Sequence, residues 1–230
     1  MKEYTKKIHF FLSRHSNIES AEAMSHTTKG AMKFLGIKTA NQKDVFKTIF
    51  KLYPLPKYSD TKDIIRELFA FEEREYLYFG MALFAKRMKF WQKTDIVFVE
   101  SMILSQPGWD IIEHVTAEVL PCFYEKYPKI ALEFLNSWSV SKNQWLKATA
   151  IMFQRTCKEN TDCELLGKYI MENLNTNYDI VDRAIGAALR CYSKTNHKWV
   201  LNFVVQNSAT MNKKAKHEAI KWIDSKGLIK

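Results

Sequence analysis

Chain breakers are rare in this sequence, and the segments between them have the spacing of helices. Only 7 glycines and 5 prolines occur in 230 residues, whereas a hairpin-rich β fold needs a turn about every 8–12 residues. Apolar side chains instead recur three and four residues apart, as one face of a helix requires. Clear runs lie at 46–53, 64–69, 96–104 and 130–138. The sequence therefore predicts an all-α fold.

Polar residues and prolines indicate where these helices begin and bend. Natural N-cap residues, whose side-chain oxygens accept the first free N–H groups of a helix, precede the periodic runs at Asn41, Ser59, Thr94, Asp162 and Asn196. Pro128 suits a first helical turn. Pro121 lies inside an otherwise helical stretch, where its missing N–H predicts a kink or a break.

The number of periodic runs suggests how the helices are organised. About a dozen helices of roughly 10–17 residues give pairs of about 35–40 residues, the size of HEAT and armadillo repeats. We expect an α-solenoid of about six stacked antiparallel pairs, forming one HEAT-like domain over 1–230 with a concave basic face. A compact helical bundle would share this periodicity and is the alternative.

Several classes of protein lack support in the sequence. No signal peptide begins the chain, and no run approaches the ~18 uncharged residues of a membrane span. The four cysteines have neither zinc-knuckle nor CxxC spacing, and no phosphate loop, nucleophile elbow or HExxH motif occurs. We expect a soluble, cytoplasmic protein without a metal, cofactor or membrane.

Positive charge gathers at both ends of the chain. Residues 1–60 contain 11 Lys and Arg against 5 Asp and Glu, and residues 181–230 contain 10 against 3. The middle of the chain is acidic or balanced. A fold that curves its ends around a ligand would present a positive surface to a polyanion. The alternative is that excess lysine only keeps the protein in solution.

The segment Gly108–Glu113 is the first candidate site. Trp109 opens a helix after Pro107 and Gly108, and Glu113 follows one turn later on the same face. An exposed indole beside a carboxylate could contact a sugar and stabilise positive charge. Alternatively, Trp109 packs under the preceding loop, and Asp110 only opposes the helix dipole.

The second candidate is a basic helical face formed by Arg183, Arg190 and Lys194, with Ala187 between them. The spacing of four, three and four residues could bind a row of phosphates. Alternatively, the face is solvated and Asp179 pairs with Arg183 at i,i+4.

Ordered short segments are similar to the HEAT-like repeat alkylpurine DNA glycosylases of the AlkD type. They are Phe34–Ile37, Ile65–Leu68, Glu73–Tyr76, Trp109–Glu113, Asn143–Ala150 and Ala184–Arg190. The resemblance runs from about residue 20 to 225. It implies a curved solenoid that grips duplex DNA and excises cationic bases such as 3-methyladenine and 7-methylguanine. It also implies that aromatic rings and a carboxylate contact the deoxyribose of a lesion that stays stacked.

The chain departs from the family pattern at its presumed site. Trp109 and Arg190 are retained, but Glu113 replaces an Asp. The longer side chain moves the carboxylate by up to ~1.5 Å. A misplacement of ~1 Å in a catalytic group can lower the rate about a hundredfold. Ala187 replaces a second Trp, and losing a stacking ring removes roughly 1–3 kcal/mol. Ala148 replaces an Arg near the phosphates, for which Lys147 could partly compensate.

A further departure lies near the N-terminus, where family members use a short helix to enter the minor groove. Residues 25–31 here contain two threonines and Gly30, and all three disfavour a helix. We expect a loop or a poorly ordered segment over 25–31.

These departures predict a diverged, monomeric family member. It binds duplex DNA weakly through Lys147, Arg183, Arg190 and Lys194, keeps Trp109 and Glu113 from the catalytic site, and has little or no excision activity. It would associate with the nucleoid if it binds DNA. Two alternatives remain: an active glycosylase with another lesion preference, and a scaffold that binds a protein partner.

Overall fold

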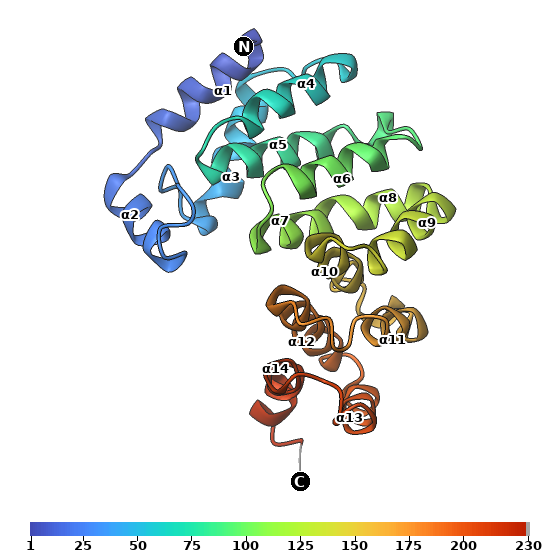
Figure 1. Ribbon diagram of the computed structural model, residues 1–230. Helices are drawn as coiled ribbons and strands as arrows, with labels where there is room; N and C mark the ends of the chain where they lie inside the picture. Colours follow the sequence, from blue (N-terminus) through green and yellow to red (C-terminus); the bar gives the residue numbers. More distant parts are fainter. Residues whose placement is uncertain (229–230) are drawn as a thin grey trace. The chain divides into compact units, whose positions relative to one another are not determined.

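The computed structural model describes residues 1–228, and helices account for nearly all of its regular structure. No strand forms in this described range beyond one isolated bridge between Lys33 and Glu73. The all-α prediction is confirmed. The chain divides into two compact units, Met1–Gln92 and Lys93–Lys230, which are described separately (Figure 1). A single domain over 1–230 with a concave face stays a prediction.

The first unit is built around a buried central helix. Its elements are α1 (Glu3–Arg14), α2 (Ile18–Thr27), α3 (Thr39–Leu52), α4 (Tyr58–Phe69), α5 (Arg74–Lys86) and the short 3-10 turn η1 (Met88–Phe90). Helix α5 packs against α1, α3 and α4 and buries nearly every residue from Arg74 to Phe84. A helix that is apolar all round belongs in a core, and α5 therefore organises this unit.

Glu75 on α5 binds the backbone of a neighbouring loop. Its side chain is fully buried and accepts hydrogen bonds from the N–H groups of Leu35 at 2.9 Å and of Gly36 and Ile37 at 3.0 Å. Gly36 has a φ of 88°, and a Cβ there would lie 2.1 Å from the Asn17 carbonyl oxygen. The loop therefore needs both the carboxylate of Glu75 and a residue without a side chain at position 36.

The segment 25–31 differs from the expected loop in its first half. Helix α2 runs through Thr27, so the prediction was wrong for 25–27. The helix is started by the side chain of Asn17, which accepts a hydrogen bond from the Ser20 N–H at 2.8 Å, and this cap offsets weak internal propensity. Beyond it, Lys29 and Gly30 have φ values of 53° and 76°, which end the helix. None of the residues of α2 is buried.

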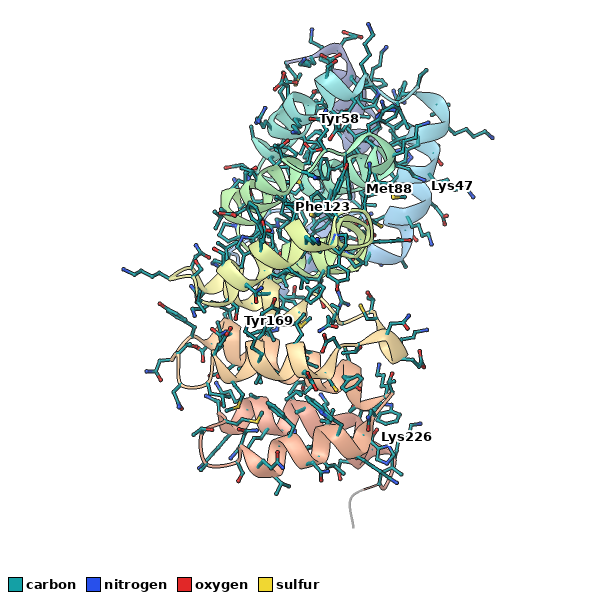
Figure 2. All side chains as sticks on the ribbon, turned by 90° about the vertical axis from the view of Figure 1, so that its right-hand side faces the viewer. Lys47, Tyr58, Met88, Phe123, Tyr169 and Lys226 are labelled. Carbon is teal, nitrogen blue, oxygen red and sulfur yellow. The ribbon has the colours of Figure 1, made fainter. Side chains whose placement is uncertain are left out.

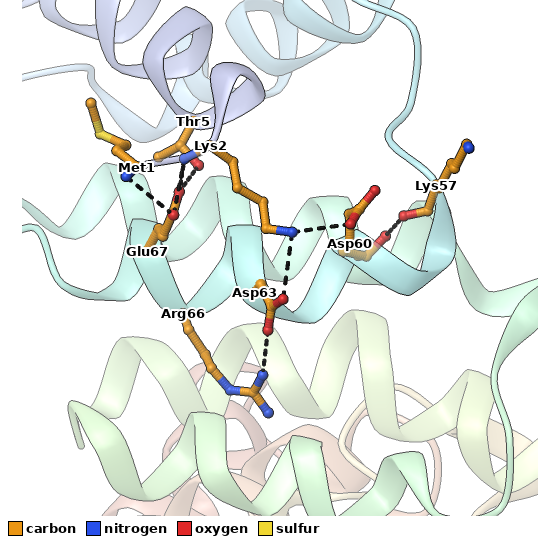
Figure 3. Close-up of polar contacts among 9 residues, drawn as sticks. Met1, Lys2, Thr5, Lys57, Asp60, Asp63, Arg66 and Glu67 are labelled. Carbon is orange, nitrogen blue, oxygen red and sulfur yellow. Dashed lines mark hydrogen bonds and ion pairs between the residues drawn. The ribbon is translucent and has the colours of Figure 1, made fainter.

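The beginning of α1 is held by acidic residues of α4 (Figure 3). The Glu67 carboxylate accepts hydrogen bonds from the Lys2 N–H at 2.7 and 2.9 Å and from the Thr5 hydroxyl at 2.5 Å. The Lys2 ammonium lies 3.0 Å from Asp60 and 3.5 Å from Asp63. The hydrogen bond from Thr5, before other contacts, lowers the pKa of Glu67 below its usual 4.5. Glu67 therefore binds α1 best when ionised.

This lowered pKa predicts an acid-dependent contribution to stability. A carboxylate with a depressed folded-state pKa stabilises the fold above its unfolded pKa and loses that contribution as pH falls through the folded value. Glu67→Gln should therefore lower the urea midpoint at pH 7, and the gap from wild type should close as pH falls below about 4.5. Glu3→Gln, at an exposed pair with Lys7, should change little at either pH. A gap that stays constant down to acid pH would contradict this assignment.

The second unit is a succession of stacked helices. It contains α6 (Asp95–Ser105), α7 (Trp109–His114), a π-helical turn η2 (Val115–Val119), α8 (Leu120–Lys126), α9 (Pro128–Ser139), α10 (Gln144–Met152), a 3-10 turn η3 (Lys158–Asn160), α11 (Cys163–Met171), α12 (Asp179–Ser193), α13 (His197–Gln206) and α14 (Lys213–Ser225). Contacts run from α9 to α10, from α10 to α12 and from α12 to α14. Side chains such as Phe123 and Tyr169 fill the layers, while Lys226 points outward (Figure 2).

A π-helical turn precedes Pro121, where the sequence predicts a kink or a break. The backbone continues from α7 through η2 into α8, and Pro121 lies in the first turn of α8. The Thr116 hydroxyl donates to the Ile112 carbonyl at 2.7 Å, which satisfies an acceptor where the regular helical pattern shifts. Turns of this kind often occur at functional sites, and this one directly follows Trp109–His114.

The N-cap predictions have mixed outcomes. Asp162 and Asn196 accept hydrogen bonds from the N–H groups of Leu165 and Trp199 as expected. Thr94 lies at the N-cap of α6 without a side-chain bond. Asn41 and Ser59 are inside α3 and α4, which begin earlier, so these two predictions were wrong. Propensity cannot locate a helix end to better than a residue or two.

Candidate functional site

A cavity of about 890 Å³ lies within the second unit. Its walls come from α7, from the residues after α10, and from the facing sides of α12 and α14. The side chains that line it include Trp109, Glu113, Arg155, Arg183, Ala187, Arg190, Lys213, Lys214 and Glu218. These residues span more than a hundred positions in sequence, and only the packing of α12 on α14 brings them together.

Helix α7 contributes the Trp109–Glu113 pair. Gly108 is its N-cap in extended conformation, and Trp109 is its first residue. Both Trp109 and Glu113 are half-buried and line the cavity, as their one-turn spacing predicts. The Arg155 guanidinium donates to the Glu113 carbonyl oxygen at 2.9 Å. This bond ties α7 to the segment that follows α10 and holds the pair in place.

Arg183 lies over the ring of Trp109. Its guanidinium carbon is 4.0 Å from the ring centroid, within the range of a cation–π contact. Burial lowers the pKa of Arg183, while the charges of Glu113 and Glu218 act in the opposite direction. No ion pair to Asp179 forms among residues 1–228. The i,i+4 pairing proposed as the alternative is therefore absent, and Arg183 contacts the indole instead.

Arg190 forms an ion pair across the cavity wall. Its guanidinium lies 2.9 Å from the carboxylate of Glu218 on α14, and the Lys221 ammonium approaches the same carboxylate at 3.9 Å. Glu218 therefore neutralises part of the charge that Arg190 would offer to a phosphate. Lys194, the last predicted contact, is exposed at the C-cap of α12 and is not among the residues that line the cavity.

The two alanines at diverged positions lie in different surroundings. Ala187 is 5% exposed and lines the cavity from α12, so a larger side chain there would narrow the space beside Trp109. Ala148 is fully buried within α10. With alanine at position 187, Trp109 is the only Phe, Tyr or Trp among the residues that line the cavity in the described part of the chain.

Lys147 is placed differently from the expectation. Its side chain is buried, and its ammonium donates to the Ser139 carbonyl at 3.1 Å and to the Asn173 side-chain oxygen at 2.8 Å. Burial lowers the pKa of Lys147, and the charge of Glu172 only partly opposes this shift. The ammonium thus joins the end of α9 to the turn after α11, and it is not placed on the cavity wall.

Lys147→Ala should therefore affect stability more than DNA affinity. The substitution leaves buried acceptors without this donor, which costs about 1–3 kcal/mol. Chemical denaturation measures that loss, with Lys142→Ala at an exposed position as the control. The salt dependence of any DNA binding should not change, because no phosphate contact is removed. A salt slope reduced by about one unit would contradict this placement.

Sequence reasoning did not find the contribution of α14. Lys213 and Lys214 lie in its first turn, where the Asn212 side chain accepts a hydrogen bond from the Lys214 N–H at 2.8 Å. The sequence Asn212-Lys213-Lys214 could have indicated a helix that begins with an Asn cap followed by two basic residues. Its position beside Arg190 and Glu218 could be seen only in the folded unit.

The charges around the cavity are nearly balanced. Five basic side chains, from Arg155, Arg183, Arg190, Lys213 and Lys214, meet four carboxylates, from Glu113, Asp179, Asp182 and Glu218. Burial, and then the charge of Asp179, raises the pKa of Asp182. The wall is therefore a mixture of both signs and attracts a polyanion less than a uniformly basic one would.

Three further findings concern metals, thiols and membranes. No group of three or more His, Cys, Asp or Glu side chains in the described part of the chain could hold a metal ion. Cys122, Cys157, Cys163 and Cys191 are all free thiols. Across residues 1–228, no helix is both long and apolar enough to cross a membrane.

Comparison with known proteins identifies the family. No curated protein matches the chain. A solved structure described as a predicted DNA alkylation repair enzyme from Enterococcus faecalis is similar in fold, with a TM-score of 0.79 and 23% identity over 90% of this chain and 96% of the other. The model of a family described as DNA alkylation repair enzyme matches residues 11–223. Because this match covers most of the sequence, the chain belongs to the DNA alkylation repair enzyme family.

Proposed function

We propose that this protein binds duplex DNA weakly and has little or no ability to release alkylated purines. Family membership supports DNA as the partner. The observation that carries the rest is at the cavity: Trp109 has no second Phe, Tyr or Trp ring across from it, and Arg183 covers its face. As a monomer with this role, the protein would act at the nucleoid, in the cytoplasm.

The chemistry of base release explains why this arrangement matters. A cationic purine is already a good leaving group, so an enzyme mainly stabilises the oxocarbenium-like sugar and positions water. The electron-rich ring of Trp109 and the negative charge of Glu113 suit the stabilisation of a positively charged sugar. The small side chain of Ala187 leaves the opposite wall open to water, and the Arg183 cation opposes another positive charge at the ring.

Weak binding follows from the charges. Affinity for DNA depends on cations that replace the counterions of phosphates. Arg190 is paired with Glu218, Lys147 is buried, and four carboxylates line the same cavity. Lys213, Lys214 and Lys194 are exposed and are the side chains most available to phosphates.

Two measurements on the full chain test the proposal. The first is release of methylated purines from alkylated duplex DNA, which should stay near the uncatalysed rate. The second is duplex binding at roughly 50 and 200 mM salt, which should be weak and should fall as salt rises. A joint Lys213→Ala/Lys214→Ala variant should reduce the salt slope by about two units. Rapid base release would overturn the proposal, and absent binding at low salt would favour a protein-binding scaffold instead.

One observation favours an active glycosylase as the second candidate. Trp109 and Glu113 line one cavity, and Arg155 fixes the backbone of Glu113. In that case a screen of other base lesions would find one that is released, and Glu113→Gln would abolish the release while leaving duplex binding intact. A Glu113→Gln variant with full activity would exclude this mechanism.

A further inference from the structure

The surroundings of the Trp109 ring resemble a site built for a cation. The electron-rich face of an indole attracts positive charge, and Trp109 presents that face to the cavity wall. Glu113, on the same helix, and Glu218, on α14, line the same cavity as Arg183. Burial lowers the pKa of Arg183, and the charges of these two carboxylates oppose that shift. One aromatic face and one carboxylate from α7, together with a second carboxylate from α14, thus act on one position.

Arg183 occupies that position without being otherwise held. Its guanidinium lies 4.0 Å from the Trp109 centroid, and within residues 1–228 it forms no hydrogen bond or ion pair. The neighbouring Arg190, by contrast, is ion-paired with Glu218 at 2.9 Å. Arg183 is also an exposed residue at the edge of a cavity of about 890 Å³. Its head group can therefore leave the ring without breaking a directed polar contact.

We propose that Trp109, Glu113 and Glu218 form a cation-binding site that the chain fills with its own Arg183, which makes Arg183 the residue that determines specificity at this cavity. A planar cation can stack on this face of Trp109 only by displacing the guanidinium. A neutral ligand of the same shape gains nothing from the two carboxylates. The free protein therefore disfavours cationic ligands at the face where they would otherwise bind best.

The site can be tested without DNA, by chemical rescue. Arg183→Ala should bind ethylguanidinium roughly threefold to tenfold better than wild type does, because the vacated position accepts the same head group. Ethylurea has a similar planar shape but no charge and should show no such gain. Tryptophan fluorescence and the melting temperature report binding, and Trp109→Leu identifies the part of the fluorescence change that comes from Trp109.

Matched variants separate the site from general effects. Arg66→Ala removes the same charge from the first unit, at a residue paired with Asp63, and should gain no ethylguanidinium binding. Arg183→Ala/Glu113→Gln should lose most of the gain, since one carboxylate has been neutralised. Arg183→Gln provides a second vacated site of similar size should Arg183→Ala fold poorly. Equal binding of ethylguanidinium to wild type and both Arg183 variants would overturn the inference.

Whether this site affects the binding of DNA rests on the proposed function and is measured separately, with modified duplexes. Duplexes with one pyrrolidine abasic analogue, which is cationic, or one tetrahydrofuran analogue, which is neutral, differ in charge at the sugar. Arg183→Ala should prefer the cationic duplex roughly threefold or more, and wild type should show no preference. If no variant binds either duplex at low salt, the proposed function fails while ethylguanidinium rescue still supports the cation site. If the duplexes bind and rescue fails, the cation site is wrong and DNA binding stands.

Discussion

Glu75→Ala is expected to cost about 3–5 kcal/mol, because it removes a charged acceptor from three buried or part-buried N–H groups at once. Each unsatisfied buried donor costs about 1–3 kcal/mol, and bonds to a charged group lie at the upper end of that range. The loop at 35–37 also packs on the start of α2, since Asn17 donates its N–H to the Leu35 carbonyl at 2.8 Å. The substitution should therefore loosen α2 together with this loop.

Denaturant unfolding and amide hydrogen exchange check this prediction. Exchange at Leu35, Gly36 and Ile37 should become fast in Glu75→Ala before the rest of the first unit unfolds. Glu72→Ala is the matched control, because Glu72 is an exposed glutamate that pairs with Lys33 at 2.6 Å. Exposed pairs contribute about 0–1 kcal/mol, so this variant should remain near wild type. Similar losses in the two variants would show that Glu75 does not have the role assigned to it.

Gly186→Val is expected to destabilise the second unit by about 3 kcal/mol and to distort the cavity. A Cβ on Gly186 would lie 2.8 Å from the Cβ of Glu218 and 3.0 Å from the Ala215 carbonyl oxygen. Backbone atoms cannot move aside unless α12 and α14 separate. Because these two helices carry Arg183, Arg190 and Glu218, the separation would break the Arg190–Glu218 ion pair as well as the packing.

At a second helical glycine, Gly167, a larger side chain is expected not to destabilise the protein. A Cβ on Gly167 of α11 would meet Phe203 at 3.5 Å and Trp199 at 3.7 Å, which are ordinary contacts. Gly167→Ala should therefore be neutral or stabilise by up to about 1 kcal/mol through helix propensity. The melting temperatures of the two variants test both predictions. A Gly186→Val variant that melts like wild type would contradict the close contact of α12 and α14.

Local sequence patterns predicted the class of fold and several details. Apolar spacing predicts helices wherever a face must be buried. The caps at Asp162 and Asn196 are confirmed, and a π-helical turn lies just before Pro121. That Trp109 and Glu113 share one face also follows from a single helical turn. In each case the cause lies within about four residues, which is the range of a helical hydrogen bond.

Other features depended on contacts that no local pattern contains. The helix over 25–27 owes its start to a cap at Asn17, eight or more residues earlier. Lys147 looked like a surface cation on a polar segment, but Ser139 at the end of α9 and Asn173 just after α11 supply oxygens that hold it inside. Lys213, Lys214 and Glu218 entered the site because Gly186 lets α14 approach α12.

The sequence by itself determined that the chain is helical and that Trp109 and Glu113 share a face, since helix formation and helical spacing depend on near neighbours. Only the tertiary structure decided which charges are available. Arg183, Arg190 and Lys147 are all cations in the sequence, yet one covers an indole, one is paired with a glutamate and one is buried. Electrostatic partners are set by distance in space, and distances between helices come from packing rather than from sequence order.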